Sequence, residues 1–128
     1  MTNGKAYTNL EQSKKLAKFL PLESADMRFC FSHTLGGRIT GHYPMIGREP
    51  SSGTIPCWSL AALINVLPKS IKFKDNKYYL RFMKDYVEYA NDTFSITGRC
   101  LHTIGNNNLV DACYEMIIKL HEQNLLWL

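Results

Sequence analysis

The sequence predicts an α+β fold in which about three helices pack on a mainly antiparallel sheet of four to five strands. Apolar residues recur at helical spacing near residues 9–20, 59–67 and 108–123. Between these stretches, apolar and polar residues alternate with a period of two, which is typical of half-buried strands. The short turn sequences Gly36-Gly37 and Asp75-Asn76 separate alternating segments and favour hairpins, so we expect antiparallel strands.

The composition predicts a single globular domain over residues 1–128. Hydrophobic residues make up 45% of the chain and charged residues 20%, which is enough apolar surface for one core. The longest uncharged apolar run, Ile55 to Leu67, contains a proline and falls short of the roughly 20 residues that a membrane span needs. The first residues lack the apolar segment of a secretory signal. We therefore expect a cytoplasmic protein without membrane contact.

The first helix is expected to begin with a capping box. Thr8 is followed three residues later by Glu11, and these side chains can satisfy each other's free backbone N–H groups. Pro21 cannot continue a helix and should end it. The lysines of this helix, at positions 14, 15 and 18, are interpreted as a solvated face.

An antiparallel hairpin is expected next, because residues 27–34 alternate and Gly36-Gly37 can form its turn. This register places Phe31 opposite His42, and His33 opposite Thr40. Residues 44–55 contain two prolines, two glycines and two serines, and are predicted to form a loop. A surface connection is the simpler interpretation of this loop, and a mobile flap is the alternative.

The chain is organised around the apolar helix that follows this loop. Ser59 is expected to cap its start, and Pro68 to end it near Leu67. Leu63 belongs to a stripe that must be covered on most sides, since little of the helix is polar. Trp58, just before the cap, is expected to pack on Leu63 or on a neighbouring element and so anchor this helix, and a ligand pocket lined by Trp58 is the alternative.

The segments on either side of Asp75-Asn76 are predicted to pair as strands, and residues 86–89 and 94–96 as a further pair. The stretch 78–89 also fits the helical period, so a helix remains the alternative there. Residues 98–108 are expected to be irregular and polar.

The last helix carries two apolar stripes and is expected to be capped by Asn107 or Asn108. An arc this wide packs on two neighbours at once, or packs on one and leaves a patch for a partner, including a second copy of the chain. The residues assigned to this partner surface are Trp58, Tyr114, Ile118, His121 and Trp127. The tail after residue 124 is too apolar to remain in water and should fold back or meet a partner.

Residues 69–84 form a basic block, with six Lys or Arg and one Asp. Lys72 and Lys74 are expected to share one face of a strand. Cations alternate here with aromatic rings, a pattern that can neutralise phosphates and stack bases. A solvated outer face of a sheet is the competing interpretation. The candidate residues for nucleic acid or another anionic ligand are Lys72, Lys74, Lys77, Tyr79, Arg81 and Lys84.

The sequence contains no motif that predicts catalysis, a metal site or a cofactor. Cys100 and His102 are the one pair considered for a thiol nucleophile, but a single pair in a polar segment is weak evidence. Cys57 and Cys113 lie in apolar surroundings and are expected to be inert.

Three segments resemble small uncharacterised proteins encoded by phages, prophages and other mobile elements of gut bacteria. They are residues 56–68, residues 75–80 and the run from Leu109 to Glu122. The family has no assigned activity, so the resemblance implies a context and no mechanism. It implies an accessory protein that binds a host molecule, such as a nucleotide signal or a defence protein.

Two functions follow as hypotheses. The first is a non-catalytic binding protein that contacts a protein or a small ligand, acting through the 44–55 loop and the apolar surface beside the last helix. The second is a nucleic-acid or nucleotide binder that uses the basic block. They differ in salt dependence, because phosphate contacts weaken steeply as salt rises.

Overall fold

The computed structural model describes residues 5–33, 39–46, 54–84, 86–91, 99–103, 105 and 108–126. Within these residues the chain has three α-helices, one short 3₁₀ helix and seven strands in two antiparallel sheets. The predicted α+β class is therefore confirmed. The prediction of one sheet of four to five strands was wrong, because the strands divide between a three-stranded and a four-stranded sheet.

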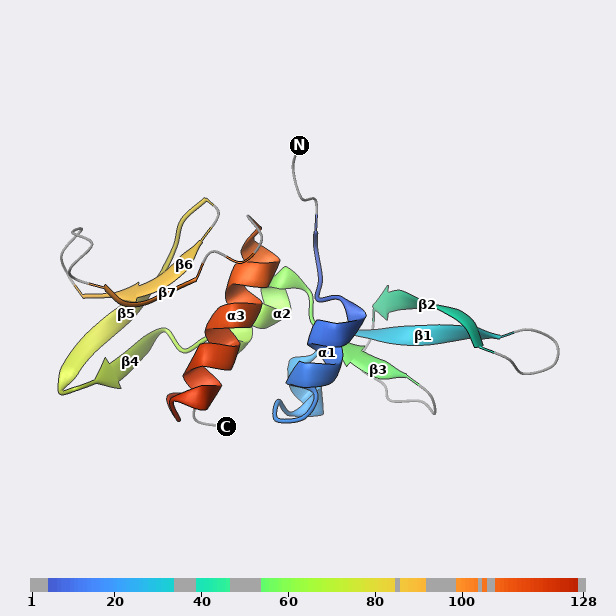
Figure 1. The fold of residues 1–128 in the computed structure, drawn as a ribbon, viewed down its shortest axis with the longest axis horizontal. Helices are drawn as coiled ribbons and strands as arrows, with labels where there is room; N and C mark the ends of the chain where they lie inside the picture. The colour runs from blue at the N-terminus through green and yellow to red at the C-terminus, as the bar shows by residue number, and fades with distance from the viewer. Residues whose placement is uncertain are drawn as a thin grey trace.

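The two sheets lie at opposite ends of the molecule with the helices between them (Figure 1). The helices are α1 (Leu10–Leu16), α2 (Leu60–Val66) and α3 (Leu109–Glu122), and the 3₁₀ helix is η1 (Leu22–Ser24). Helix α1 lies against the first sheet, whereas α3 packs on α2 and on the second sheet. No helix in the described part of the chain is both long and apolar enough to span a bilayer.

The first sheet has the order β2-β1-β3, from β1 (Met27–His33), β2 (Ile39–Ile46) and β3 (Ile55–Cys57). Phe31 lies opposite His42 as predicted, but a register shift after Ser32 places His33 opposite Ile39 and not Thr40. The predicted Gly36-Gly37 turn lies outside the described residues.

The ends of the predicted 44–55 loop belong to strands. Residues 44–46 continue β2, and Ile55 begins β3, which pairs with β1. Both β2 and β3 are edge strands, where Pro44 and Pro56 are tolerated although they lack an N–H. The middle of the loop, and with it the flap hypothesis, lies outside the described residues.

The capping box of α1 is formed by Asn9 and Gln12, so the prediction of Thr8 and Glu11 was wrong. The Asn9 side chain accepts from the Gln12 N–H at 2.8 Å, and the Gln12 side chain accepts from the Asn9 N–H at 3.0 Å. Thr8 is instead buried and pairs with the backbone of Trp58. The helix also ends earlier than predicted, because the N–H groups of Lys18 and Phe19 bond to carbonyls three residues back.

Helix α2 follows its predicted boundaries. The Ser59 hydroxyl accepts from the Ala62 N–H at 3.2 Å, and Leu67, before Pro68, is the C-cap. Trp58 is fully buried, and its indole N–H donates to the Ser24 hydroxyl at 3.0 Å. The expectation that Trp58 anchors α2 to a neighbouring element is therefore confirmed.

The second sheet has the order β4-β5-β6-β7. Its strands are β4 (Ser70–Phe73), β5 (Asn76–Phe82), β6 (Val87–Ala90) and β7 (Arg99–Thr103). Within the stretch 78–89, residues 78–82 belong to β5 and residues 87–89 to β6, so these residues form strands and not the alternative helix. Strand β7 was missed, because residues 98–108 were expected to be irregular, and the predicted strand 94–96 lies outside the described residues.

The β4–β5 turn is displaced by one residue from the predicted Asp75-Asn76. Its central residues are Lys74 and Asp75, with φ of 52° and 67°, and Phe73 lies opposite Asn76. Two successive positive φ values define a type I′ turn, whose twist suits a two-residue hairpin. The displacement takes Lys74 out of the strand.

Helix α3 completes the core. Asn108, one of the two residues expected to cap it, is the N-cap, and the core residues of α3 include Val110, Cys113 and Ile117. At its end Asn124 has φ of 58°, and the Leu125 N–H bonds to the Leu120 carbonyl at 2.8 Å, which is a Schellman motif. The chain therefore folds back at Leu125 and Leu126, and both pack against the core. The last two residues of the predicted tail lie outside the described residues.

Candidate functional site

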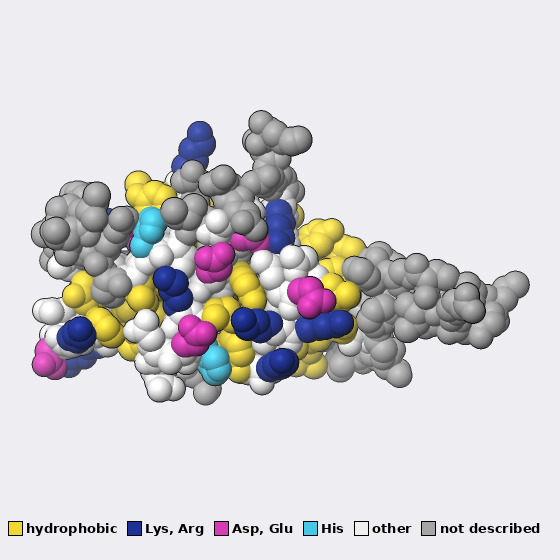
Figure 2. Space-filling view, in the orientation of Figure 1, with side chains coloured by type: hydrophobic (Ala, Val, Ile, Leu, Met, Phe, Trp, Pro, Cys, Tyr) yellow, Lys and Arg dark blue, Asp and Glu magenta, His cyan; other side chains and the backbone are white. Residues whose placement is uncertain are grey.

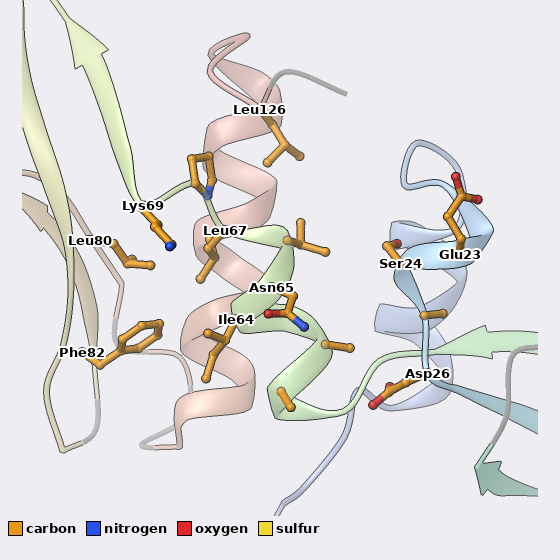
Figure 3. A pocket seen from close by; sticks show the side chains of 15 residues that line it. Glu23, Ser24, Asp26, Ile64, Asn65, Leu67, Lys69, Leu80, Phe82 and Leu126 are labelled. Carbon is orange, nitrogen blue, oxygen red and sulfur yellow. The ribbon is translucent and has the colours of Figure 1, made fainter.

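A groove of about 720 Å³ crosses the face of α2 that α3 does not cover. Figure 3 shows Leu80 and Phe82 of β5 on one side of α2, and Glu23, Ser24 and Asp26 on the other. Its volume lies in the range of roughly 300–1,000 Å³ that is typical of small-molecule sites. Residues 23–26, 61–69 and 80–82 and Leu126 near the C-terminus therefore converge on one concave surface.

Hydrogen bonds fix the wall of the groove that η1 and the following residues form. The Asp26 carboxylate accepts from the Ser59 N–H at 2.9 Å and from the Ser59 hydroxyl. The Ser24 hydroxyl accepts from Trp58 and donates to the Pro21 carbonyl at 2.6 Å. Because these groups hold the start of α2 against η1, this wall is formed before any ligand binds.

The lining is mainly apolar, since ten of the fifteen residues that form it have apolar side chains. Phe82 is 38% exposed, Ala61 is exposed and Ile64 is half-buried, so apolar surface remains open to a ligand. The exposed side chains of Asn65 and Lys69 supply polar groups at the surface. An apolar body with few polar contacts is the ligand type that such a lining fits.

The structure does not bring the predicted partner surface together. Trp58 is wholly buried, because it fills the core between α2 and η1, and it is not available to a partner. Tyr114 and Ile118 are partly buried against the core, and His121 is exposed but stacks on Phe19, with ring centroids 3.8 Å apart. Trp127 lies outside the described residues. Helix α3 thus packs on two neighbours within the chain.

The basic block forms the β4–β5 hairpin, and its side chains do not share one face. Lys72 lies directly opposite Lys77, and Tyr79 follows on the same face, with 44% of its surface exposed. Arg81 is also on this face, but it forms an ion pair of 2.6 Å with Glu88 of β6. The cations available on this face are therefore Lys72 and Lys77.

Two of the predicted basic residues lie elsewhere. Lys74 is in the turn, with its ammonium group 5.4 Å from the ring centroid of Phe73, a residue on the opposite face from Lys72. The prediction that Lys72 and Lys74 share a face was therefore wrong. Lys84 is exposed and lies beyond the end of β5.

The lysines of α1 match their interpretation as a solvated face. Figure 2 shows the side of the molecule that carries α1 and α3, where Lys and Arg side chains are interspersed with Asp and Glu. Lys14 and Lys15 are exposed. Mixed charge of this kind gives no single-sign field to attract a polyanion.

The buried thiols are poor nucleophiles. Burial raises the pKa of Cys113 to about 12, and burial also raises the pKa of Cys57 above its ordinary value. A thiol with a raised pKa is protonated at neutral pH and unreactive. His102 contacts Tyr86, with ring centroids 4.6 Å apart, and the side chain of Cys100 lies outside the described part. The described residues contain no group of three metal-ligating side chains.

Sequence reasoning missed the groove because its walls come from four separate parts of the chain. One signal was present: Asn65 is polar within a helix that is otherwise apolar, and Ala61 is one turn before it. Residues four apart lie on one helix face, so this pair marks the surface that α2 leaves uncovered.

Comparison with known proteins gives no relative. The chain matches no protein-family model, no curated protein and no solved structure. The resemblance to phage and mobile-element proteins stays a prediction.

Proposed function

We propose that this chain is a non-catalytic binding protein whose groove across α2 receives the apolar part of a small ligand or of a partner protein. One observation carries the proposal: a concave, mainly apolar surface of about 720 Å³ lies beside exposed polar side chains. A lining of this kind favours binding through apolar contact, with polar groups that orient the ligand.

The polar groups of the groove support binding better than chemistry. Ser24 and Asp26 are engaged with Trp58 and Ser59, where they hold the wall in place. Glu23, Asn65 and Lys69 are exposed, so they can contact polar atoms of a bound molecule. If the phage resemblance holds, that molecule belongs to the host.

A fragment screen by ¹⁵N–¹H correlation spectroscopy tests the proposal. A set of small aromatic and aliphatic fragments is added to the labelled protein, and we expect shifts at the backbone amides of residues 61–67 and 80–82. Ala61→Trp, which places a large ring in the groove from an exposed position, should abolish these shifts. Ala17→Trp, at an exposed position outside the groove, is the matched control and should retain them.

The same variants also test whether a second copy of the chain occupies the groove. Sedimentation of the wild type at increasing concentration would then reveal a dimer that Ala61→Trp loses and Ala17→Trp keeps. Fragment shifts that cluster away from α2 and β5, or that survive Ala61→Trp, would contradict the proposal.

A further inference from the structure

The outer face of the four-stranded sheet is distinct from the groove and has a different chemistry. Alternation along β5 places Lys77, Tyr79 and Arg81 on this face, and the register places Lys72 beside Lys77 and Ser70 beside Tyr79. The side chains between them, including Tyr78 and Leu80, pack toward the core. Along β4 and β5 the face is therefore polar and cationic around a half-exposed aromatic ring, whereas Glu88 and Ala90 of β6, on the same face, are buried.

Lys72 and Lys77 form a like-charge pair across the two strands. Directly opposed side chains have Cβ atoms roughly 5 Å apart, and like charges at that separation destabilise a sheet. Both side chains are exposed, and the register places no carboxylate between them. An anion bound between the two ammonium groups would remove the repulsion. The lysine pair is therefore more favourable with a phosphate bound than in the free hairpin.

The aromatic ring lies beside this pair. The Lys77 ammonium is 5.5 Å from the ring centroid of Tyr79, within cation–π range. Since Tyr79 is 44% exposed, part of the ring remains open to a planar group. A cation and an open ring in contact can meet the phosphate and the base of one nucleotide at neighbouring positions.

The acidic groups near this face do little to oppose an anion. Glu88 is 3% exposed, and both the Nε and the Nη2 groups of Arg81 donate to its Oε2 atom, at 2.9 and 2.6 Å. Its charge is therefore shielded beneath the guanidinium. Asp75 is exposed, but it lies in the turn at the tip of the hairpin, beyond the Lys72–Lys77 pair.

We propose that this outer face binds single-stranded nucleic acid, with Lys72 and Lys77 on phosphates and an unpaired base stacked on Tyr79. Charge complementarity selects a polyanion, and the ring selects a strand whose bases are not already stacked in a duplex. The proposal goes beyond the groove and does not depend on it. Ala61→Trp should leave strand binding unchanged.

The test is fluorescence anisotropy with a labelled oligothymidylate of about 12 nucleotides, a length within the usual site size, at about 50 and 200 mM salt. Tyr79→Ala should weaken binding roughly 5- to 150-fold, the range that one base–aromatic stack supplies. Replacing Lys72 and Lys77 together by Gln should lower the slope of log K against log salt by about 1.4, since each phosphate contact to a single strand contributes about 0.7.

The matched control is Lys14→Gln with Lys15→Gln, which removes the same charge from exposed positions on α1. It should leave the slope near the wild-type value. Thermal melting of every variant verifies that the fold persists, and the Lys72 and Lys77 variant should melt no earlier than the wild type because it loses a repulsion.

Several results would overturn the proposal. If the Lys72 and Lys77 variant and the Lys14 and Lys15 variant lose the same amount of salt-dependent binding, the net charge of the protein, and not this face, attracts the strand. Equal affinity for a duplex of the same length would exclude stacking on Tyr79. Binding to vesicles of anionic lipid that is as tight as binding to the oligonucleotide and indifferent to Tyr79→Ala would identify a membrane surface, and no binding at low salt would leave the lysines as a solvated face.

Discussion

Along β4 and β5 the two faces of the four-stranded sheet differ sharply, although the same strands make both of them. On the inner face Ile71, Val87 and Tyr89 are buried against the helices. On the outer face Lys72 and Tyr79 are exposed. Because side chains alternate along a strand, one short hairpin can supply both a core surface and a recognition surface. Substitutions on the inner face should therefore change the stability of the fold, and substitutions on the outer face should change binding, with little effect of one on the other.

The largest expected difference in stability is between alanine substitutions at two tyrosines of this sheet. Tyr89 is fully buried, and its hydroxyl donates to the Pro68 carbonyl at 2.6 Å, whereas Tyr79 is 44% exposed. Tyr89→Ala should lower the free energy of unfolding by about 3–5 kcal/mol, as large-to-small changes in cores do. Tyr79→Ala should cost less than about 1 kcal/mol. Urea denaturation measures both, and similar losses would remove the energetic distinction between the faces.

The second effect concerns the ion pair on the outer face. Arg81 is partly exposed and Glu88 is almost fully buried. Arg81→Ala should therefore destabilise the protein by about 2–3 kcal/mol, because the buried carboxylate loses this guanidinium. This is at or just below the roughly 3–5 kcal/mol lost when a fully buried pair is broken, since Arg81 is partly exposed. Glu88→Gln should cost less, since it leaves a neutral amide beside an arginine that reaches water. If Glu88→Gln is the more damaging variant, the pair does not act as a shielded carboxylate.

The third prediction concerns the contacts that hold α3 in place over the inner face. Helix α3 is tied to the N-terminal segment at Asp111, whose carboxylate accepts from Lys5 at 2.5 Å and from Gln12 at 2.8 Å. Burial alone would raise the pKa of Asp111, but these hydrogen bonds and one from Asn108 hold it below its ordinary value. A depressed pKa means that the unfolded state binds the proton more readily.

This contribution is fully present above the ordinary carboxyl pKa of about 3.9 and is lost as pH falls through the folded-state value. Asp111→Asn should cost about 1.5–3 kcal/mol at neutral pH, the usual range for hydrogen bonds to a charged group. The difference in free energy of unfolding between the wild type and this variant should become smaller below about pH 4. Urea midpoints at several pH values measure it, and a gap that stays constant with pH would show that the charge of Asp111 has no role.

The alternation that creates the two faces could be predicted from the sequence, and so could the α+β class. Local patterns placed the cap Ser59 and narrowed the cap of α3 to Asn107 or Asn108, because capping depends on neighbouring residues. The turn was placed one residue too late, since Asp75-Asn76 has good turn composition while pairing of Phe73 with Asn76 decides the register. Lys74 was consequently assigned to the wrong surface.

Features that depend on distant segments could not be predicted. Strand β7 is short and polar, and it becomes a strand because it pairs with β6. Thr8 had the right spacing for a cap, but it is buried against Trp58, 50 residues away. The groove depends on η1, α2 and β5 meeting in space, which no local pattern contains. Each of these features therefore depends on contacts between distant segments, and these contacts override the local propensity of the residues involved.

The smallest effect should be a gain in stability on the outer face. Lys72→Glu replaces a cross-strand like-charge pair with an attractive pair to Lys77, and it should raise the free energy of unfolding by about 0.2–1 kcal/mol. The gain should shrink in high salt, because the pair is exposed.

The same substitution on α1, Lys15→Glu, makes an equal change in net charge without a strand partner, and it should not reproduce the gain. A loss of stability in Lys72→Glu would mean that the two ammonium groups do not repel in the free protein. A gain in stability combined with a loss of oligonucleotide binding is the outcome expected of residues retained for recognition, because it separates what the outer face contributes to the fold from what it binds.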